Sequence, residues 1–231
     1  MQHAKSAVVI LSGGLDSTTC LGVAVAAGYE VYALTFDYGQ RHAVEIEAAK
    51  KVAAHYGVKE HRIAKLPFLR DIGKSALTED DLEVPTQGVQ KGEIPITYVP
   101  GRNLIFLSIA TAYAETVEAA AIYIGVNALD YSGYPDCRPE FIQAFQTVAR
   151  LATKVGFEGL SLDIQTPLLH LSKADIIRLG TSLSVPYELT TSCYQGQEEA
   201  CGECDSCRLR LAGFAQAGLT DPIAYRKQST R

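Results

Sequence analysis

Two hydroxyl residues, a pair of glycines and a carboxylate follow an apolar run near the start of the chain. The sequence SGGLDS at residues 12–17 stands directly behind the apolar residues 7–11, and a helical pattern follows it. Glycines let the backbone approach a ligand with its N–H groups, and the start of a helix adds unpaired amides and a positive dipole end. This junction therefore predicts a phosphate site. The alternative is a tight turn in which Asp16 caps the helix.

The loop differs from the common P-loop of nucleotide-binding proteins. The chain has no G-x-x-x-x-G-K-[ST] motif, and Asp16 stands where a P-loop carries lysine. A carboxylate repels phosphates unless Mg²⁺ lies between them or the carboxylate orients donors. The order SGGxDS resembles the pyrophosphate loop of ATP pyrophosphatases, which adenylate a substrate and release pyrophosphate. The resemblance implies that ATP, with Mg²⁺, binds Leu11, Ser12, Gly13, Gly14, Leu15, Asp16, Ser17, Thr18, Thr19, Cys20 and Leu21.

Four of the six cysteines stand close together near the end of the chain. Cys193, Cys201, Cys204 and Cys207 have the spacing C-x7-C-x2-C-x2-C. Thiolates at two-residue gaps are typical of tight turns around a tetrahedral metal. Zn²⁺ is favoured, although an iron–sulfur cluster suits the same ligands. A closed Cys₄ site has no open coordination position, so we expect a structural role for the metal.

Two basic residues are candidates for gripping an anion. Arg102 follows the segment YVPG and begins a helix, and Lys173 lies in the first turn of another helix. Arginine suits a bidentate grip on a carboxylate or phosphate, and either residue could hold a transferring phosphate. His170 is a candidate base. The alternatives are a solvated charge for Lys173 and a strand-end histidine for His170.

The loop at residues 125–138 follows a buried strand and combines carboxylates with aromatic rings. Such a composition suits a ligand with an aromatic ring and a hydrogen-bonding edge. Asp130 or Asp136 would accept from that edge, and Tyr131 or Tyr134 would pack against the ring.

Alternating strand and helix patterns must position these residues. Strands are predicted at residues 7–11, 30–36, 59–64, 120–126 and 161–165, and helices at residues 16–27, 43–56, 102–118, 139–155, 172–180 and 206–217. Repeated βα units predict an α/β fold with a doubly wound, mostly parallel sheet and ligands at the carboxyl ends of its strands. We expect residues 1–185 to form the ATP-binding domain and residues 186–231 a small zinc-binding segment. Residues 68–96 lack periodicity and are interpreted as a lid or a dimer-contact insertion.

The composition excludes several classes of protein. The 231 residues are 47% hydrophobic with a net charge of −5, which suits one sizeable core and gives no general attraction to nucleic acid. No segment has the length of a membrane span, and the apolar run after residue 6 is too short for a signal peptide. We therefore expect a cytoplasmic protein with reduced cysteines and no membrane partner.

Together these segments resemble the 7-cyano-7-deazaguanine synthase family of the queuosine and deazapurine pathway. The matching pieces are LSGGLDSTTCL at 11–21, FDYGQRH at 36–42, YVPGRN at 98–103, GVNALDYSGYPD at 125–136, TPLLHLSKADIIRLG at 166–180 and the four-cysteine run. The resemblance implies an adenine nucleotide alpha hydrolase-like fold, a structural zinc ion and a homodimer. It also implies ATP-dependent conversion of the carboxyl group of 7-carboxy-7-deazaguanine to a nitrile.

The residues agree with that chemistry. We expect Asp16, Arg102 and Lys173 to be catalytic, with Arg102 or Lys173 holding the carboxylate or the phosphates. Position 2 is Gln2 rather than a nucleophilic cysteine, and the chain has no spare length for a glutaminase domain, so free ammonia is the expected nitrogen donor. The alternatives are a tRNA-modifying ATP pyrophosphatase of the sulfurtransferase or lysidine-synthetase type, and a nucleotide sensor without enzymatic activity. The acidic balance of the chain disfavours a tRNA substrate.

Overall fold

The fold is built on a parallel sheet in which the first strand is central, with the second strand on one side of it and the fourth strand on the other. The computed structural model describes residues 5–40, 44–79, 81–85, 93–129, 134–195 and 199–226. Five parallel strands lie in the order β3-β2-β1-β4-β5. They are β1 (Ser6–Ile10), β2 (Glu30–Asp37), β3 (Glu60–Lys65), β4 (Ala121–Tyr123) and β5 (Asp163–Gln165). Because the chain leaves β1 toward β2 and later returns to pair β4 on its other side, a ligand crevice is expected at the carboxyl end of β1.

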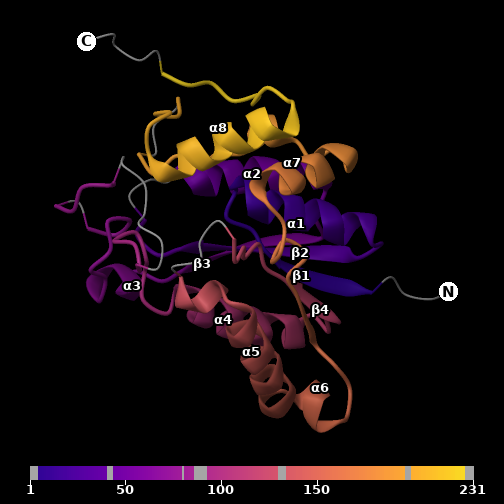
Figure 1. The fold of residues 1–231 in the computed structure, drawn as a ribbon. Helices are drawn as coiled ribbons and strands as arrows, with labels where there is room; N and C mark the ends of the chain where they lie inside the picture. Colours follow the sequence, from indigo (N-terminus) through magenta and orange to yellow (C-terminus); the bar gives the residue numbers. More distant parts are fainter. Residues whose placement is uncertain are drawn as a thin grey trace.

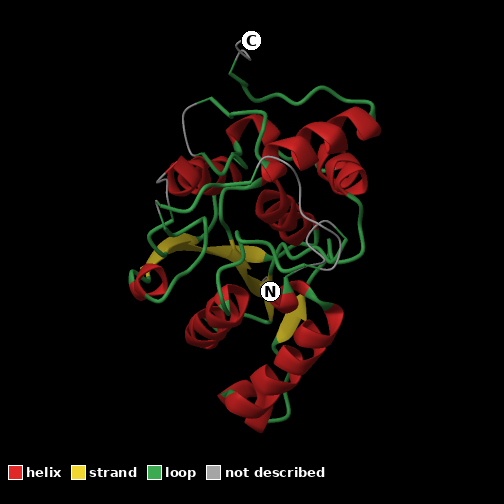
Figure 2. Ribbon diagram, turned by 60° about the vertical axis from the view of Figure 1, so that its left-hand side comes forward, coloured by secondary structure: helices red, strands yellow, loops and turns green. Residues whose placement is uncertain are grey.

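Helices cover both faces of the sheet (Figures 1 and 2). Helices α1 and α2 lie on one face with α7 and α8 outside them, and α4 and α5 lie on the other face. The helices are α1 (Leu15–Ala26), α2 (Val44–Tyr56), α3 (Phe68–Asp71), α4 (Arg102–Thr116), α5 (Pro139–Ala152), α6 (Lys154–Phe157), α7 (Lys173–Ser182) and α8 (Asp205–Ala217), with 3₁₀ turns at Pro135–Cys137 and Tyr187–Leu189. None of the helices in the described ranges is long and apolar enough to cross a membrane.

Strand β1 is apolar throughout because both of its faces are buried. Val8 and Ile10 join the cluster on the side of α4, whereas Ala7 and Val9 join the cluster formed with α1 and α2. A strand buried on both faces gives a continuous apolar run instead of an alternating one. The predicted α/β fold with a doubly wound, parallel sheet is thus confirmed.

Most element boundaries lie within two residues of the prediction, and two elements differ more. The helix expected at 139–155 is broken into α5 and α6, because Thr153 has extended backbone angles (φ −108°, ψ 154°) and its side chain accepts a hydrogen bond from the Gly156 N–H. Thr153 thereby caps a second helix. The strand expected at 120–126 is shorter, since β4 spans only Ala121–Tyr123.

The segment at 68–96 packs on the cysteine-rich segment. Ala76 and Val84 are buried in the same cluster as Cys193, Cys204 and Cys207. The two segments are far apart in the sequence, but both reach the crevice. Leu77 of one and Cys193 of the other line the same cavity.

Candidate active site and metal centre

The loop between β1 and α1 is held open at the carboxyl end of β1 by glycine geometry. Gly13 has a φ of +81°, and a Cβ there would lie 2.5 Å from the carbonyl oxygen of Glu45 and 2.6 Å from the backbone nitrogen of Ala49. Only glycine satisfies both conditions without strain. Helix α1 begins immediately after Gly14, so its unpaired N–H groups face the crevice.

Hydrogen bonds between the two serines fix the shape of the loop. The Ser12 N–H donates to the Ser17 Oγ at 3.1 Å, the two hydroxyl oxygens are 3.0 Å apart, and the Ser17 Oγ donates to the Gly14 carbonyl oxygen at 3.1 Å. The loop is therefore braced by hydrogen bonds between its own residues. Its backbone amides and hydroxyl groups make it a preorganised anion site.

A cavity of about 230 Å³ opens above this loop. Among the residues expected to bind ATP, the cavity is lined by Leu11, Ser12, Gly14, Leu15, Asp16 and Ser17. Gly13, Thr18, Thr19, Cys20 and Leu21 are buried beneath the loop and do not line it. Thr19, for instance, donates to the Leu15 carbonyl oxygen and lies 2.9 Å from the Tyr187 hydroxyl. Stacked Phe36 and Phe106, with ring centroids 3.9 Å apart, give the cavity an apolar wall suited to a planar ring.

Lys173 and Asp16 meet in this cavity. The Lys173 Nζ donates to both Asp16 carboxylate oxygens, at 2.7 and 2.8 Å, and the two side chains are 9% and 18% exposed. Ser172 caps α7 by accepting from the Asp175 N–H. A Cβ at Gly213 would lie 2.4 Å from the Lys173 Cγ, so this glycine lets α8 press on the lysine stem.

Arg102 also lines the cavity, at the start of α4. Its Nη1 donates to the Tyr38 hydroxyl at 3.3 Å, and its guanidinium carbon lies 6.0 Å from the centre of the Tyr38 ring. Asp136 holds this helix start in place, because its Oδ2 accepts from the Asn103 N–H at 2.9 Å. Asp136 is buried but does not line the cavity.

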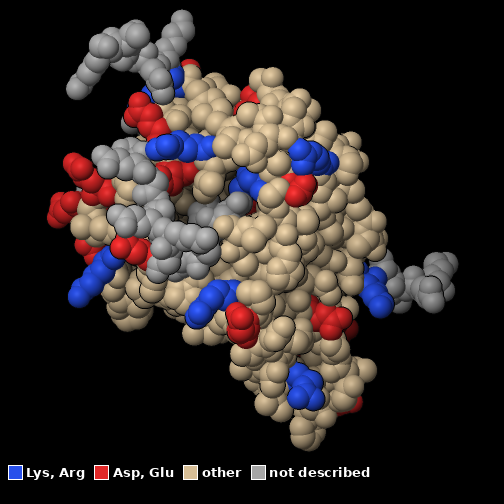
Figure 3. Space-filling model, in the orientation of Figure 1, with Lys and Arg blue, Asp and Glu red and all other residues tan. Residues whose placement is uncertain are grey.

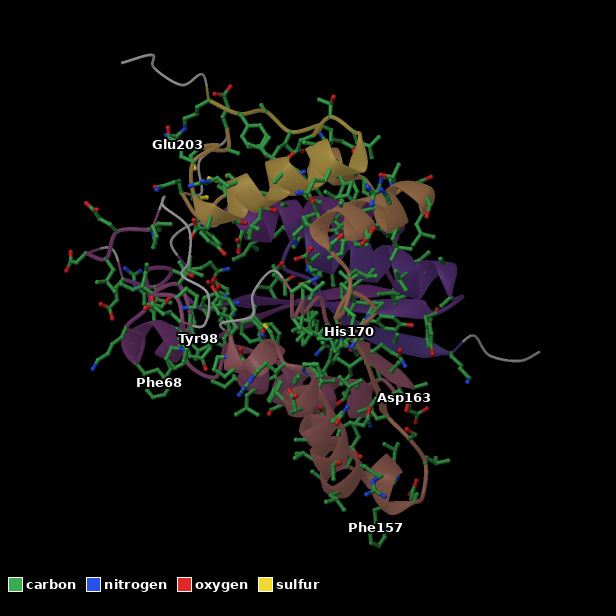
Figure 4. The ribbon with its side chains drawn as sticks, viewed as in Figure 1. Phe68, Tyr98, Phe157, Asp163, His170 and Glu203 are labelled. Carbon is green, nitrogen blue, oxygen red and sulfur yellow. The ribbon has the colours of Figure 1, made fainter. Side chains whose placement is uncertain are left out.

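The other predicted substrate residues have different positions. Tyr134 is buried, lines the cavity and pairs its hydroxyl with the Thr97 hydroxyl at 2.8 Å. Asp130 and Tyr131 lie outside the described residues. His170 is exposed and is not a lining residue of this cavity (Figure 4). The substrate roles of Asp130, Tyr131, Tyr134 and Asp136 stay predictions.

Sequence reasoning missed several residues of this site, among them Glu45 and Asn127. Glu45 lies in the first turn of α2 and lines the cavity. Burial raises the pKa of its carboxyl from 4.5 to about 7, although the positive charge of Arg102 lowers this pKa. Asn127 donates to the carbonyl oxygens of Leu168 and Leu171 and so holds the chain just before Lys173. The acidic first turn of a helix that follows the 36–42 loop was the available signal for Glu45.

Replacing Glu45 with glutamine is expected to stabilise the protein at pH 8 more than at pH 5. A carboxyl whose pKa is higher in the folded state favours folding when protonated, so that stability is present at low pH and is lost as the pH rises through about 7. The difference between the two pH values should reach up to about 3 kcal/mol. Urea unfolding of both proteins at each pH measures it. Equal stabilisation at pH 5 and pH 8 would contradict the assignment.

The four cysteine sulfurs come together as the spacing predicted. All four Sγ atoms lie within 4.8 Å of one another, and those of Cys201 and Cys207 are 3.9 Å apart. A tetrahedral metal with sulfur ligands at about 2.3 Å requires sulfur separations of about 3.8 Å. Backbone N–H groups of Gln195 and Cys201 donate to the Cys193 Sγ. Hydrogen bonds from Cys204 and Cys207 hold the pKa of the Cys193 thiol well below its ordinary value. The group fits a metal ion.

A family model for queuosine biosynthesis protein QueC matches residues 6–218 of this chain. The chain belongs to the QueC family. A QueC-family relative from Oceanobacillus iheyensis, named 7-cyano-7-deazaguanine synthase, is 60% identical over 96% of this chain and 98% of its own length. Another from Desulfitobacterium hafniense, named 7-cyano-7-deazaguanine synthase 2, is 57% identical over 98% of this chain and 96% of its own length.

Solved structures share the QueC fold at low sequence identity. A 4-thiouridine synthetase–RNA complex with bound ATP has a TM-score of 0.55 and 19% identity, covering 96% of this chain and 47% of that protein. An NMN synthetase from Francisella tularensis has a TM-score of 0.50 and 15% identity, covering 98% of this chain and 90% of that one. These likenesses concern the fold alone. They agree with the predicted pyrophosphate-loop fold.

Proposed function

We propose that this chain converts the carboxyl group of 7-carboxy-7-deazaguanine to a nitrile, with ATP and ammonia as co-substrates. The observation that carries the proposal is the Lys173–Asp16 pair at the rim of the pyrophosphate loop, inside a cavity with an aromatic wall. The names of the curated relatives in the QueC family support the same reaction.

The reaction requires two activations at one carbon atom. A carboxylate is a poor electrophile, so one of its oxygens must first receive a phosphoryl or adenylyl group from ATP. Ammonia then adds to the carbonyl carbon and the activated oxygen leaves, which gives the amide. When the amide oxygen is activated in turn, its departure with the added group and the loss of two N–H protons give the nitrile.

The chain's own residues suit these steps. The loop amides and the Ser12 and Ser17 hydroxyl groups would hold the phosphates, and Lys173 would stabilise the charge that develops on them. Arg102 would grip the substrate carboxylate. The stacked Phe36 and Phe106 would support a ring in the cavity.

Two metal ions complete the proposal. Zn²⁺ on Cys193, Cys201, Cys204 and Cys207 would be structural, because four thiolates leave no open coordination position. Mg²⁺ would accompany ATP, since the Asp16 carboxylate offers the oxygen ligands that it prefers and the ion offsets phosphate charge. Thiolate ligands require a reducing compartment, which supports a cytoplasmic location.

A tRNA-modifying ATP pyrophosphatase is not favoured. The curated relatives carry the name of the nitrile-forming enzyme, whereas the likeness to a 4-thiouridine synthetase concerns the fold. On the face drawn in Figure 3, the described Lys and Arg side chains alternate with Asp and Glu instead of forming a basic stripe. A polynucleotide ligand would need such a stripe.

Phosphorus NMR of the purified protein tests the proposal directly. With ATP, ammonia and 7-carboxy-7-deazaguanine, we expect one ATP to be cleaved for each activation and the nitrile to accumulate. The acid without ammonia should give no nitrile. ATP cleavage that depends on tRNA and ignores the deazaguanine acid would overturn the proposal in favour of the tRNA-modifying alternative.

We also propose a homodimer that uses the apolar tip around α6. Leu151, Phe157 and Leu160 are 74%, 91% and 61% exposed, and Phe157 points away from the body at the end of the α5–α6 projection (Figure 4). Covering apolar area of this kind favours association. Phe157→Asp is expected to shift the protein toward monomer in sedimentation velocity, whereas Leu219→Asp, 41% exposed after α8, should not. A wild-type monomer would contradict the proposal.

A further inference from the structure

Arg210 is a buried arginine that the proposed chemistry does not use. It lies on α8 behind the metal-binding turn and is only 1% exposed. Its Nε and Nη2 donate to the two carboxylate oxygens of Asp221, at 2.7 and 2.9 Å, and the two side chains are almost fully buried. Arg210 also lines the cavity, but its charge is already matched by this bidentate pair with Asp221.

The remaining donors of Arg210 hold one short segment of chain. Nη1 donates to the Thr190 Oγ1 at 2.7 Å and to the Ser192 Oγ at 3.4 Å, and Nη2 donates to the Tyr187 carbonyl oxygen at 3.1 Å. The guanidinium thus fixes both ends of the 187–192 segment. The planar fork of arginine can do this, whereas the single ammonium group of lysine cannot satisfy all these partners at once.

This segment contacts the pyrophosphate loop. The Thr191 N–H donates to the Gly13 carbonyl oxygen at 3.0 Å, and a Cβ at Gly14 would lie 3.5 Å from the Thr191 carbonyl oxygen. At its other end, the Tyr187 hydroxyl lies 2.9 Å from the Thr19 Oγ1 of α1. The segment therefore supports the loop at Gly13 and contacts α1 at Thr19.

The same segment continues into the cavity and then into the metal centre. Thr191, Ser192, Cys193 and Tyr194 all line the cavity. Cys193 is also one of the four clustered thiols. One arginine thus links α8, the cavity wall and the loop.

We infer that Arg210 is a positioning residue for ATP: it holds Thr190 and Ser192 so that the Thr191 N–H keeps the Gly13 carbonyl oxygen, and with it the pyrophosphate loop, in the shape that accepts phosphates. This rests on the proposed use of ATP but not on the identity of its acceptor. Arg210 does not touch the reacting atoms. It acts through the 190–192 backbone.

Two variants and one matched control test the inference. Arg210→Lys keeps a charge against Asp221 but loses the fork. Thr190→Val keeps the side-chain shape but removes the hydroxyl that accepts from the Arg210 Nη1 and donates to the Tyr187 carbonyl oxygen. Tyr225→Phe is the control, because the Tyr225 hydroxyl donates to the Asp221 Oδ2, which also accepts from the Arg210 Nε, whereas the bonds to the 187–192 segment come from Arg210 itself. All three should melt at lower temperature than the wild type and keep the same metal content.

Only the first two should change ATP use. We expect Arg210→Lys to raise the KM for ATP about tenfold or more, and Thr190→Val to raise it by a smaller factor, with kcat at saturating ATP and the KM for the acceptor little changed. Calorimetric binding of a non-hydrolysable ATP analogue should weaken in parallel.

The outcomes are separable. If Arg210→Lys does not fold, the KM for ATP of Thr190→Val decides alone. A lower melting temperature with a wild-type KM for ATP, or an equal rise in the Tyr225→Phe control, would overturn the inference and leave Arg210 a purely structural residue. If the wild type itself does not bind the ATP analogue, the proposed function fails as well.

Discussion

Lys173→Met is expected to lower turnover by about 10³-fold, with a smaller effect on the KM for ATP. Lys173 is one of the few cations lining the cavity, and its ammonium group is held within 2.8 Å of both Asp16 oxygens at the mouth of the pyrophosphate loop. Donors fixed at the point where charge develops act mainly on the transition state, and removing one typically costs 10²–10³ in kcat. The loss of the cationic partner of Asp16 should add to this effect.

Initial rates of nitrile formation, measured at saturating ATP, check this expectation. Asp16→Asn should also lower the rate of nitrile formation. The double variant should lose less activation free energy than the sum of the two single losses, because the residues act as a pair. Lys59→Met serves as the matched control, since Lys59 pairs with Glu30 at an exposed position and lies outside the cavity. Wild-type rates in Lys173→Met would show that the pair is structural.

The sheet was predictable because its signals are local and strong. A short apolar run such as residues 7–11, with a glycine pair close behind it, favours a strand buried on both faces, and that glycine pair indicates where the first helix begins. The break at Thr153 was not predictable from periodicity, since an apolar stripe continues through it. Only the cap that Thr153 makes with Gly156 separates α5 from α6.

The site was predictable where function and local geometry coincide. The pyrophosphate loop and the four cysteines need only neighbours in sequence, and both have the expected arrangement. Contacts between segments that are distant in the sequence could not be predicted. Asp136 supports the start of α4 through the Asn103 N–H, a role that depends on a 3₁₀ turn more than thirty residues away in sequence. Glu45 and Arg210 gain their surroundings only when α2, α8 and the loop pack together.

Cys204→Ser is expected to release the metal ion and to abolish activity. Cys204 is fully buried, and the buried apolar residues of its cluster other than cysteines are the small side chains Ala76, Val84 and Ala200. A structural zinc ion contributes on the order of 10 kcal/mol to the folding of such a segment. Without it, the turn at 193–207 should lose its order.

Loss of the metal ion should also affect the pyrophosphate loop, because Cys193 belongs both to the metal-binding group and to the cavity wall. Thr191, two residues before Cys193, donates its N–H to the Gly13 carbonyl oxygen, so a disordered turn removes a support of the loop. Metal analysis of Cys204→Ser should give far less than one ion per chain, and ATP-analogue binding should weaken with it. Cys20→Ala, which removes a buried thiol on α1 far from the cluster, should keep its metal. Retained activity in a metal-free Cys204→Ser protein would show that the wall at 191–194 holds without the metal.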